Sequence, residues 1–157
     1  MAAKTVAVDK KVPAFSRPAT GGKNWKLGDA AGKTLVLYFY PRDNTPGCTK
    51  EGEAFRDLYP AYKKAGAVVV GVSPDSVASH EKFKAKMDFP FDLLADEDQS
   101  LCKLFDVIRE KSMYGRKFIG VERSTFLIDA NGVLRQEWRK VKVPGHAEAV
   151  LAAAKAL

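Results

Sequence analysis

Cys48 occupies a position in this chain where a thiol could act as a nucleophile. It lies in the segment 40–49, YPRDNTPGCT, where an apolar run gives way to the predicted start of a helix. Thr45 is a favourable N-cap residue and Pro46 suits the first helical turn, so Cys48 falls at the third helical position. Unpaired backbone N–H groups and the positive end of the helix dipole favour the thiolate there. The segment therefore indicates a reactive cysteine.

The spacing of apolar residues predicts how far Cys48 is exposed. Residues at helical spacing share the side that should face a sheet, namely Cys48, Phe55, Leu58, Tyr59 and Tyr62. Gly52, one turn further along, is expected to leave room beside the sulfur. We therefore expect Cys48 to be half-buried at the mouth of the core. The alternative is a small buried hydrophobic residue, as free cysteines often are.

The second cysteine, Cys102, is distant from Cys48 in the sequence, and the two form no Cys-x-x-Cys pair. This spacing argues against a disulfide scaffold and against a thioredoxin-type dithiol. We expect Cys102 to be partly buried packing in an amphipathic helix, with a catalytic pair as the alternative. His80 and His146 show no zinc-ligand spacing with either cysteine, so no metal site is expected.

Length and composition predict a single domain over residues 1–157. The chain is 46% hydrophobic and 29% charged, which suffices for one substantial core without disulfides or metal. The N-terminal residues lack the extended hydrophobic centre of a signal peptide, and no long apolar segment follows. A cytoplasmic location is the expectation.

The formal net charge of +7 raises the question of nucleic-acid binding. The basic residues are dispersed and interrupted by acids, and the densest run, residues 135–142, reads as a solvated face. We therefore expect no nucleic-acid partner and no membrane partner, although the charge can steer anions. A basic binding module remains a remote alternative.

The elements that must position Cys48 alternate between strand and helix patterns, which favours α/β architecture. Buried strands are predicted at 34–40 and 67–73, a short strand at 91–94, and a hairpin of 124–129 with 133–138 around Asn131-Gly132. Helices are predicted at about 46–64 with Gly66 as the stop, after Ser73–Asp75 through Met87, at 96–107 and at 146–157. Gly21-Gly22 suggests a further hairpin near the N-terminus.

This order of elements resembles thioredoxin-like folds. The run Pro41-x-x-x-Thr45-x-x-Cys48, preceded by the aromatic strand and followed far downstream by residues 123–129, RSTFLID, resembles the peroxiredoxin signature. Its fuller form resembles the peroxiredoxin Q branch, also called bacterioferritin comigratory proteins, over nearly the whole chain. The resemblance implies a central mixed β-sheet flanked by helices, with an N-terminal hairpin extension.

The resemblance also implies roles for individual residues. Cys48 matches the peroxidatic cysteine, which attacks a hydroperoxide and becomes a sulfenic acid. Pro41 matches the residue that shields the thiolate, Thr45 the one that hydrogen-bonds the reacting oxygens, and Arg123 the one that holds thiolate and peroxide. Glu51, one turn below the cysteine, either pairs with a nearby basic group or only complements the helix N-terminus.

The chain departs from the family pattern in its second cysteine. Some relatives carry a resolving cysteine five residues after the first, where this chain has Glu53, and others in the next helix, where residues 79–86 contain none. The leading hypothesis is a one-cysteine thiol peroxidase that reduces hydrogen peroxide or organic hydroperoxides without a cofactor. Thioredoxin, glutaredoxin or a small thiol would recycle it. The alternatives are Cys102 as the resolving residue and, remotely, a basic thioredoxin-like binding module. The resemblance leans towards a monomer or weak homodimer.

Overall fold

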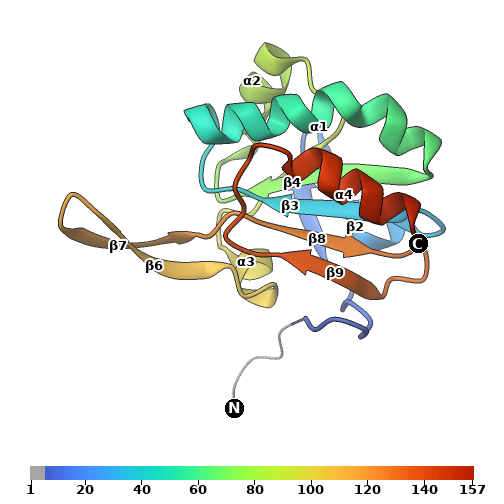
Figure 1. Cartoon of the computed structure of the whole chain (residues 1–157). Coiled ribbons are helices and arrows are strands. Elements are labelled where there is room, and N and C mark those ends of the chain that lie inside the picture. Colours follow the sequence, from blue (N-terminus) through green and yellow to red (C-terminus); the bar gives the residue numbers. More distant parts are fainter. Residues whose placement is uncertain (1–5) are drawn as a thin grey trace.

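The computed structural model describes residues 6–157, and its centre is a seven-stranded mixed sheet (Figure 1). The sheet order is β2-β1-β5-β4-β3-β8-β9. Its strands are β1 (Ser16–Ala19), β2 (Lys23–Lys26), β3 (Thr34–Phe39), β4 (Ala67–Ser73), β5 (Leu93–Ala95), β8 (Ser124–Ile128) and β9 (Leu134–Trp138). Strands β3, β4 and β5 run parallel, whereas β8 pairs antiparallel with β3. Strand β3 is therefore held on both sides by long neighbours.

Helices cover both faces of this sheet. They are α1 (Pro46–Lys64), α2 (Val77–Met87), the short α3 (Ser100–Leu104) and α4 (His146–Lys155), with one 3-10 turn at Leu27–Ala30. Figure 1 shows α1 and α4 on one side of the sheet and α3 on the other. Alternate residues of a strand point to opposite faces, so β3 contributes to two separate cores. Val36 and Tyr38 pack with α1, α2 and α4, while Leu35 and Leu37 pack with α3.

Several sequence predictions are confirmed closely. Helix α1 and strand β4 have the predicted bounds, and Gly66 follows α1 with a positive φ of 74°. The N-terminal hairpin is present as β1 and β2, and the Asn131-Gly132 turn joins β8 to β9. The expected α/β architecture, a central mixed sheet flanked by helices with an N-terminal hairpin, is thus confirmed.

The predicted helix over 96–107 is largely wrong, because only Ser100–Leu104 is α-helical. The Asp96 carboxylate accepts hydrogen bonds from the backbone N–H groups of Leu101 and Cys102, at 3.0 and 2.8 Å. This side chain therefore caps the start of a later, shorter helix. Asp106, with a φ of 54°, leaves the helical conformation just beyond its end.

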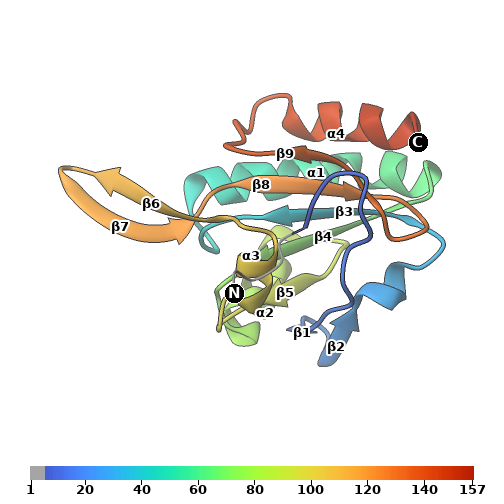
Figure 2. The same ribbon diagram turned by 90° about the horizontal axis from the view of Figure 1, so that it is seen from below.

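A second hairpin, β6 (Ile108–Met113) with β7 (Arg116–Val121), was not among the predicted elements. Figures 1 and 2 show it reaching out from the rest of the fold as a two-stranded arm. Positive φ angles at Tyr114 and Gly115 form its two-residue turn, the conformation that hairpins favour. Strand β7 leads through Glu122 to Arg123, so the arm starts next to a predicted site residue.

Within residues 6–157, no helix has both the length and the apolar character needed to cross a membrane.

Candidate active site around Cys48

Cys48 sits in the first turn of α1, directly after the loop that follows β3. Only 2% of the residue is exposed, so the expectation of half-burial is wrong. The space beside it is also filled, since a Cβ atom built on Gly52 would lie 2.4 Å from Cζ of Phe89. Glycine at this position allows the Phe89 ring to pack directly against the backbone of α1. The sulfur of Cys48 is therefore enclosed and has no open space beside it.

Arg123 reaches Cys48 from the segment between β7 and β8. Its Nη2 lies 3.4 Å from the Cys48 sulfur, and its Nη1 donates a 2.6 Å hydrogen bond to Oε1 of Glu51. The same guanidinium therefore bridges the cysteine and a carboxylate one turn further along the helix. Of the two interpretations of Glu51, the structure shows the one in which it pairs with a basic group.

Gly47 makes this approach possible, and sequence reasoning missed it. A Cβ atom at this position would lie 3.0 Å from Nη2 of Arg123, closer than most Cβ contacts in proteins. A side chain at residue 47 would require the guanidinium to shift from this position by a few tenths of an ångström. The sequence shows a glycine directly before the cysteine, but nothing local indicates that an arginine 75 residues beyond that cysteine needs the space.

Glu51 is the electrostatically unusual group of the site. Only 1% of it is exposed, and burial raises its pKa to about 7 even though the Arg123 guanidinium opposes that change. Its Oε2 has no hydrogen-bond partner among the residues that the structure describes, and the same holds for the buried hydroxyl of Tyr38. Burial, and then the charge of Glu51, raise the pKa of Tyr38 well above its ordinary value. Near neutral pH, Glu51 can therefore hold or release a proton beside Arg123.

Thr45 occupies the N-cap position of α1, but its side chain is not the cap that the sequence predicted. The hydroxyl donates a 3.0 Å hydrogen bond to the carbonyl oxygen of Arg42, while the Thr45 carbonyl accepts from the N–H of Thr49. Pro41 is half-buried at the start of the same loop. Among the described contacts, Arg123 reaches the Cys48 sulfur and Glu51 reaches Arg123. The other two predicted residues, Thr45 and Pro41, lie in the loop that precedes α1.

Cys102 lies on the other face of the sheet. It belongs to the core that contains Leu35, Leu37 and Phe39, whereas Cys48 packs in the core with Val36 and Tyr38. It is fully buried, which corrects the expectation of partial burial. Burial first, and then the neighbouring Asp96, raise the pKa of the Cys102 thiol far above its ordinary value. Both cysteines are free thiols in this structure.

Comparison with known proteins identifies the family of this chain. A model of the AhpC/TSA family matches residues 8–137. The peroxiredoxin Bcp of Xanthomonas campestris is 57% identical over 137 residues, 87% of this chain and 86% of that protein. The peroxiredoxin Bcp of Bacillus subtilis is 48% identical over 142 residues, 90% of each chain.

Solved structures agree with these relatives. Xanthomonas campestris peroxiredoxin Q superposes with a TM-score of 0.86 at 55% identity, covering 90% of each chain. A further structure, with a TM-score of 0.86 and 54% identity over 90% of each chain, comes from work on the alkyl peroxide reduction activity of the bacterioferritin comigratory protein of that organism. These neighbours confirm the thioredoxin-like fold. With an arginine held against a helix-borne cysteine, the chain belongs to the AhpC/TSA family, in its peroxiredoxin Q or bacterioferritin comigratory protein branch, and is a thiol-dependent peroxidase.

Proposed function

We propose that Cys48 is the peroxidatic cysteine of this peroxidase. Its thiolate attacks the terminal oxygen of a hydroperoxide, so that an S–O bond forms and the O–O bond breaks. The sulfur is oxidised to a sulfenic acid, and the leaving oxygen takes up a proton and departs as water or an alcohol. Two thiols of an external reductant then return the sulfenic acid to the thiol, forming their own disulfide and water.

The contact between Arg123 and Cys48 carries this proposal. A guanidinium keeps its charge throughout and offers several donors in a fixed plane, so it can stabilise the thiolate and then the charge that moves onto the leaving oxygen. The 2.6 Å pairing with Glu51 fixes the orientation of that plane. Cys48 lies in the first turn of α1, so the helix dipole adds to the same field.

Thr45 and Pro41 complete the proposed site. The Thr45 hydroxyl is half-exposed and would turn from the Arg42 carbonyl to an incoming peroxide, for which it can donate or accept. Pro41 lacks an N–H group and would shield the sulfur from water at the edge of the loop. Glu51 supports Arg123 rather than touching the substrate.

We further propose that the enzyme works with one cysteine. The positions of Cys48 and Cys102 on opposite faces of the sheet support this, because a disulfide needs Cα atoms within about 7 Å. The elevated pKa of buried Cys102 also makes it a poor attacking thiolate. Resolution by Cys102 would require α3 to leave its core, and it stays the alternative.

The proposal also covers the reductant, the substrate, the oligomeric state and the location of the enzyme. The reductant would be thioredoxin, glutaredoxin or a small thiol, and the substrate hydrogen peroxide or an organic hydroperoxide. The chain would act as a monomer or weak homodimer in the cytoplasm, as an antioxidant enzyme.

The test is peroxide consumption with defined reductants for wild type, Cys48→Ser and Cys102→Ser, followed by non-reducing mass spectrometry after one equivalent of peroxide. We expect Cys48→Ser to lose turnover, Cys102→Ser to keep it, and wild type to yield a sulfenic acid or a mixed disulfide. A disulfide between Cys48 and Cys102 would reject the one-cysteine mechanism. Undiminished turnover in Cys48→Ser would reject the proposed role of Cys48 itself.

A further inference from the structure

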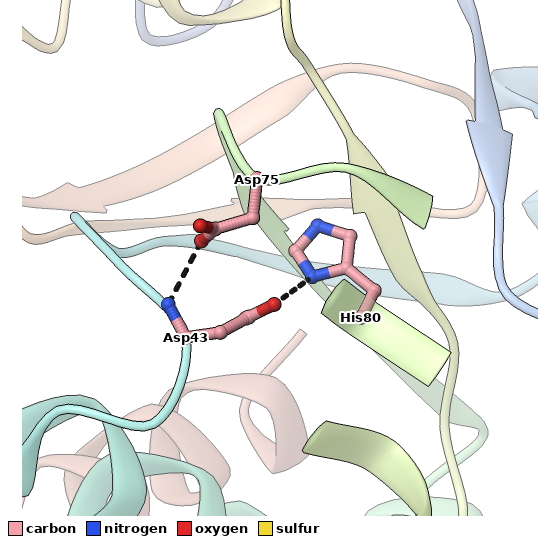
Figure 3. Close-up of side chains that lie close together, drawn as sticks. All are labelled: Asp43, Asp75 and His80. Atoms are coloured by element: carbon pink, nitrogen blue, oxygen red, sulfur yellow. Dashed lines mark hydrogen bonds and ion pairs between the residues drawn. The ribbon is translucent and has the colours of Figure 1, made fainter. Parts of the chain in front are cut away.

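Asp43, in the loop between β3 and α1, accepts hydrogen bonds on both of its carboxylate oxygens. The Tyr40 hydroxyl donates to Oδ1 at 2.6 Å, and the Ser79 hydroxyl donates to Oδ2 at 2.8 Å. Nδ1 of His80 lies 2.7 Å from the same Oδ2 (Figure 3). Asp43 is buried and His80 is completely so. Two of these three partners, Ser79 and His80, belong to α2, so the carboxylate joins this loop to a separate helix.

The other nitrogen of His80 determines how the ring is protonated. Nε2 lies 2.8 Å from the carbonyl oxygen of Leu94, which can only accept, so Nε2 carries a hydrogen. A second proton is therefore needed between Nδ1 and Oδ2 of Asp43, because two bare acceptors would repel each other at 2.7 Å. Asp43, Asp75 and His80 each offer an atom of a metal-binding type, and these atoms lie within 4.8 Å of one another; in this structure hydrogen bonds join the three residues. The cluster is a hydrogen-bonded clamp.

Two further bonds hold the same loop. The backbone N–H of Asp43 donates to Oδ2 of Asp75, which also accepts from the Ser73 hydroxyl, and Figure 3 shows the aspartates and the imidazole converging. On the exposed side, Nζ of Lys86 in α2 donates to Oδ1 of Asn44 at 2.6 Å. Asn44 itself has a φ of 61°, the left-handed conformation that asparagine tolerates. The loop is thus held at successive residues, between the two that are proposed to face the peroxide, Pro41 and Thr45.

We propose that Asp43 and His80 are positioning residues for peroxide reduction: their buried pair holds the loop so that Pro41 and Thr45 meet the peroxide at Cys48. This inference rests on the proposed role of Cys48. It assigns to α2 a function in the active site although no residue of α2 has been placed against the sulfur. A small displacement of a reacting group can cost about 100-fold in rate, so loosening this clamp should reduce the rate of the chemical step.

The experiment compares two reactions of the same sulfur. Peroxide needs the positioned loop, whereas alkylation by iodoacetamide needs only an accessible thiolate. We expect Asp43→Ala and His80→Ala each to lower the second-order rate constant for hydrogen peroxide by about 10- to 100-fold. Their alkylation rate constants should be unchanged or higher. Asp43→Ala leaves every residue of α2 in place, so it keeps the test open if His80→Ala does not fold.

The two substitutions should also act as one unit. If the pair has a single role, Asp43→Ala/His80→Ala should be within about twofold of the slower single variant, rather than showing the product of both losses. Compared with Asp43→Ala, Asp43→Asn should regain most of the rate constant for hydrogen peroxide, to within about threefold of wild type. The amide N–H can donate to a neutral His80, and the amide oxygen still accepts from Tyr40.

Ser76→Ala is the matched control for a purely structural effect. The Ser76 hydroxyl caps α2 by accepting from the N–H of Ser79, and its loss weakens the same helix without removing any partner of Asp43. All assays are run below the unfolding temperature of every variant. Ser76→Ala should keep its peroxide rate constant within about twofold of wild type.

Two results would overturn the inference. One is a peroxide rate constant for folded Asp43→Ala or His80→Ala that equals that of Ser76→Ala. The other is an additive double variant, in which the losses of the two single variants multiply. The test separates this failure from a failure of the proposed function, because an error in the role of Cys48 would show as undiminished peroxide turnover in Cys48→Ser.

Discussion

Glu51→Gln should change how the stability of the protein depends on pH. Glu51 is 1% exposed, and burial raises its pKa from 4.5 to about 7 against the pull of Arg123. The native state therefore binds the Glu51 proton more tightly than the unfolded chain does. This contribution to stability is fully present below pH 4.5 and is lost as pH rises through 7.

The size of the effect follows from the two pKa values. The interval from 4.5 to about 7, at about 1.36 kcal/mol per pH unit, corresponds to about 3 kcal/mol of unfolding free energy. Glutamine is uncharged across this interval, and its amide oxygen can still accept from Nη1 of Arg123. The variant should therefore lack this component of the pH dependence while keeping the main contact of the site.

Urea unfolding at half-unit steps from pH 4.5 to 8 measures the difference. The Cys48→Ser background is used for both proteins, so that thiol oxidation does not interfere. We expect the free energy of unfolding of the Glu51 protein to fall, relative to the Glu51→Gln protein, by about 3 kcal/mol between the two ends of the range. Glu53→Gln, in the same helix, controls for the removal of one negative charge near the start of α1.

Parallel curves for the two proteins across this range would refute the reasoning, because Glu51 would then take up no proton on folding. A relative gain in stability of the Glu51 protein with rising pH would refute it more strongly. That sign would mean that the ion pair with Arg123 outweighs burial.

Four further substitutions test the site and its packing. Arg123→Lys should lower the second-order rate constant for peroxide by about 10- to 100-fold, because a single ammonium nitrogen lacks the fixed planar spacing with which Nη1 and Nη2 reach Glu51 and Cys48. Stopped-flow oxidation measures this rate constant, and a wild-type value would contradict the bridging role. Gly47→Ala places a Cβ 3.0 Å from Nη2 of Arg123 and should lower the same rate constant by about threefold to tenfold, with an unchanged circular dichroism spectrum. Gly52→Ala must displace the Phe89 ring and should lower the free energy of unfolding, measured in urea, by about 1–3 kcal/mol. An unchanged urea midpoint would show that the ring moves freely. Cys102→Ser replaces a fully buried thiol beside Asp96 and should keep peroxide turnover, whereas loss of turnover in the folded variant would favour a resolving role.

The sequence predicted the elements whose signals are local. Helix α1 matches its predicted bounds because Pro46 opens it and Gly66 ends it, and strand β4 is an uninterrupted apolar run. The β8–β9 hairpin follows from the Asn131-Gly132 turn. In each case a residue type fixes the backbone irrespective of distant contacts.

The predictions that were wrong or missing concern features set by contacts that the local sequence pattern does not show. Helix α3 is short because the Asp96 side chain caps it from outside, and a contact of this type is invisible in helical periodicity. Cys48 is buried more deeply than its helix position implied because Arg123 comes in from a distant segment. The resemblance to peroxiredoxins was needed to single out that arginine, and it gave no indication of the space at Gly47.

Successive side chains of β3 point to opposite faces of the sheet, and this alternation bears on the last step of the catalytic cycle. Val36 and Tyr38 face the core that contains Cys48, and the residues between and beside them face the core that contains Cys102. A sulfenic acid formed at Cys48 is therefore separated from the second thiol by a central strand paired on both sides. Bringing the sulfurs together would require one cysteine to leave its core and also to pass to the opposite face of the sheet, whereas an external thiol needs only access to Cys48 on its own face. The smaller rearrangement favours an external reductant.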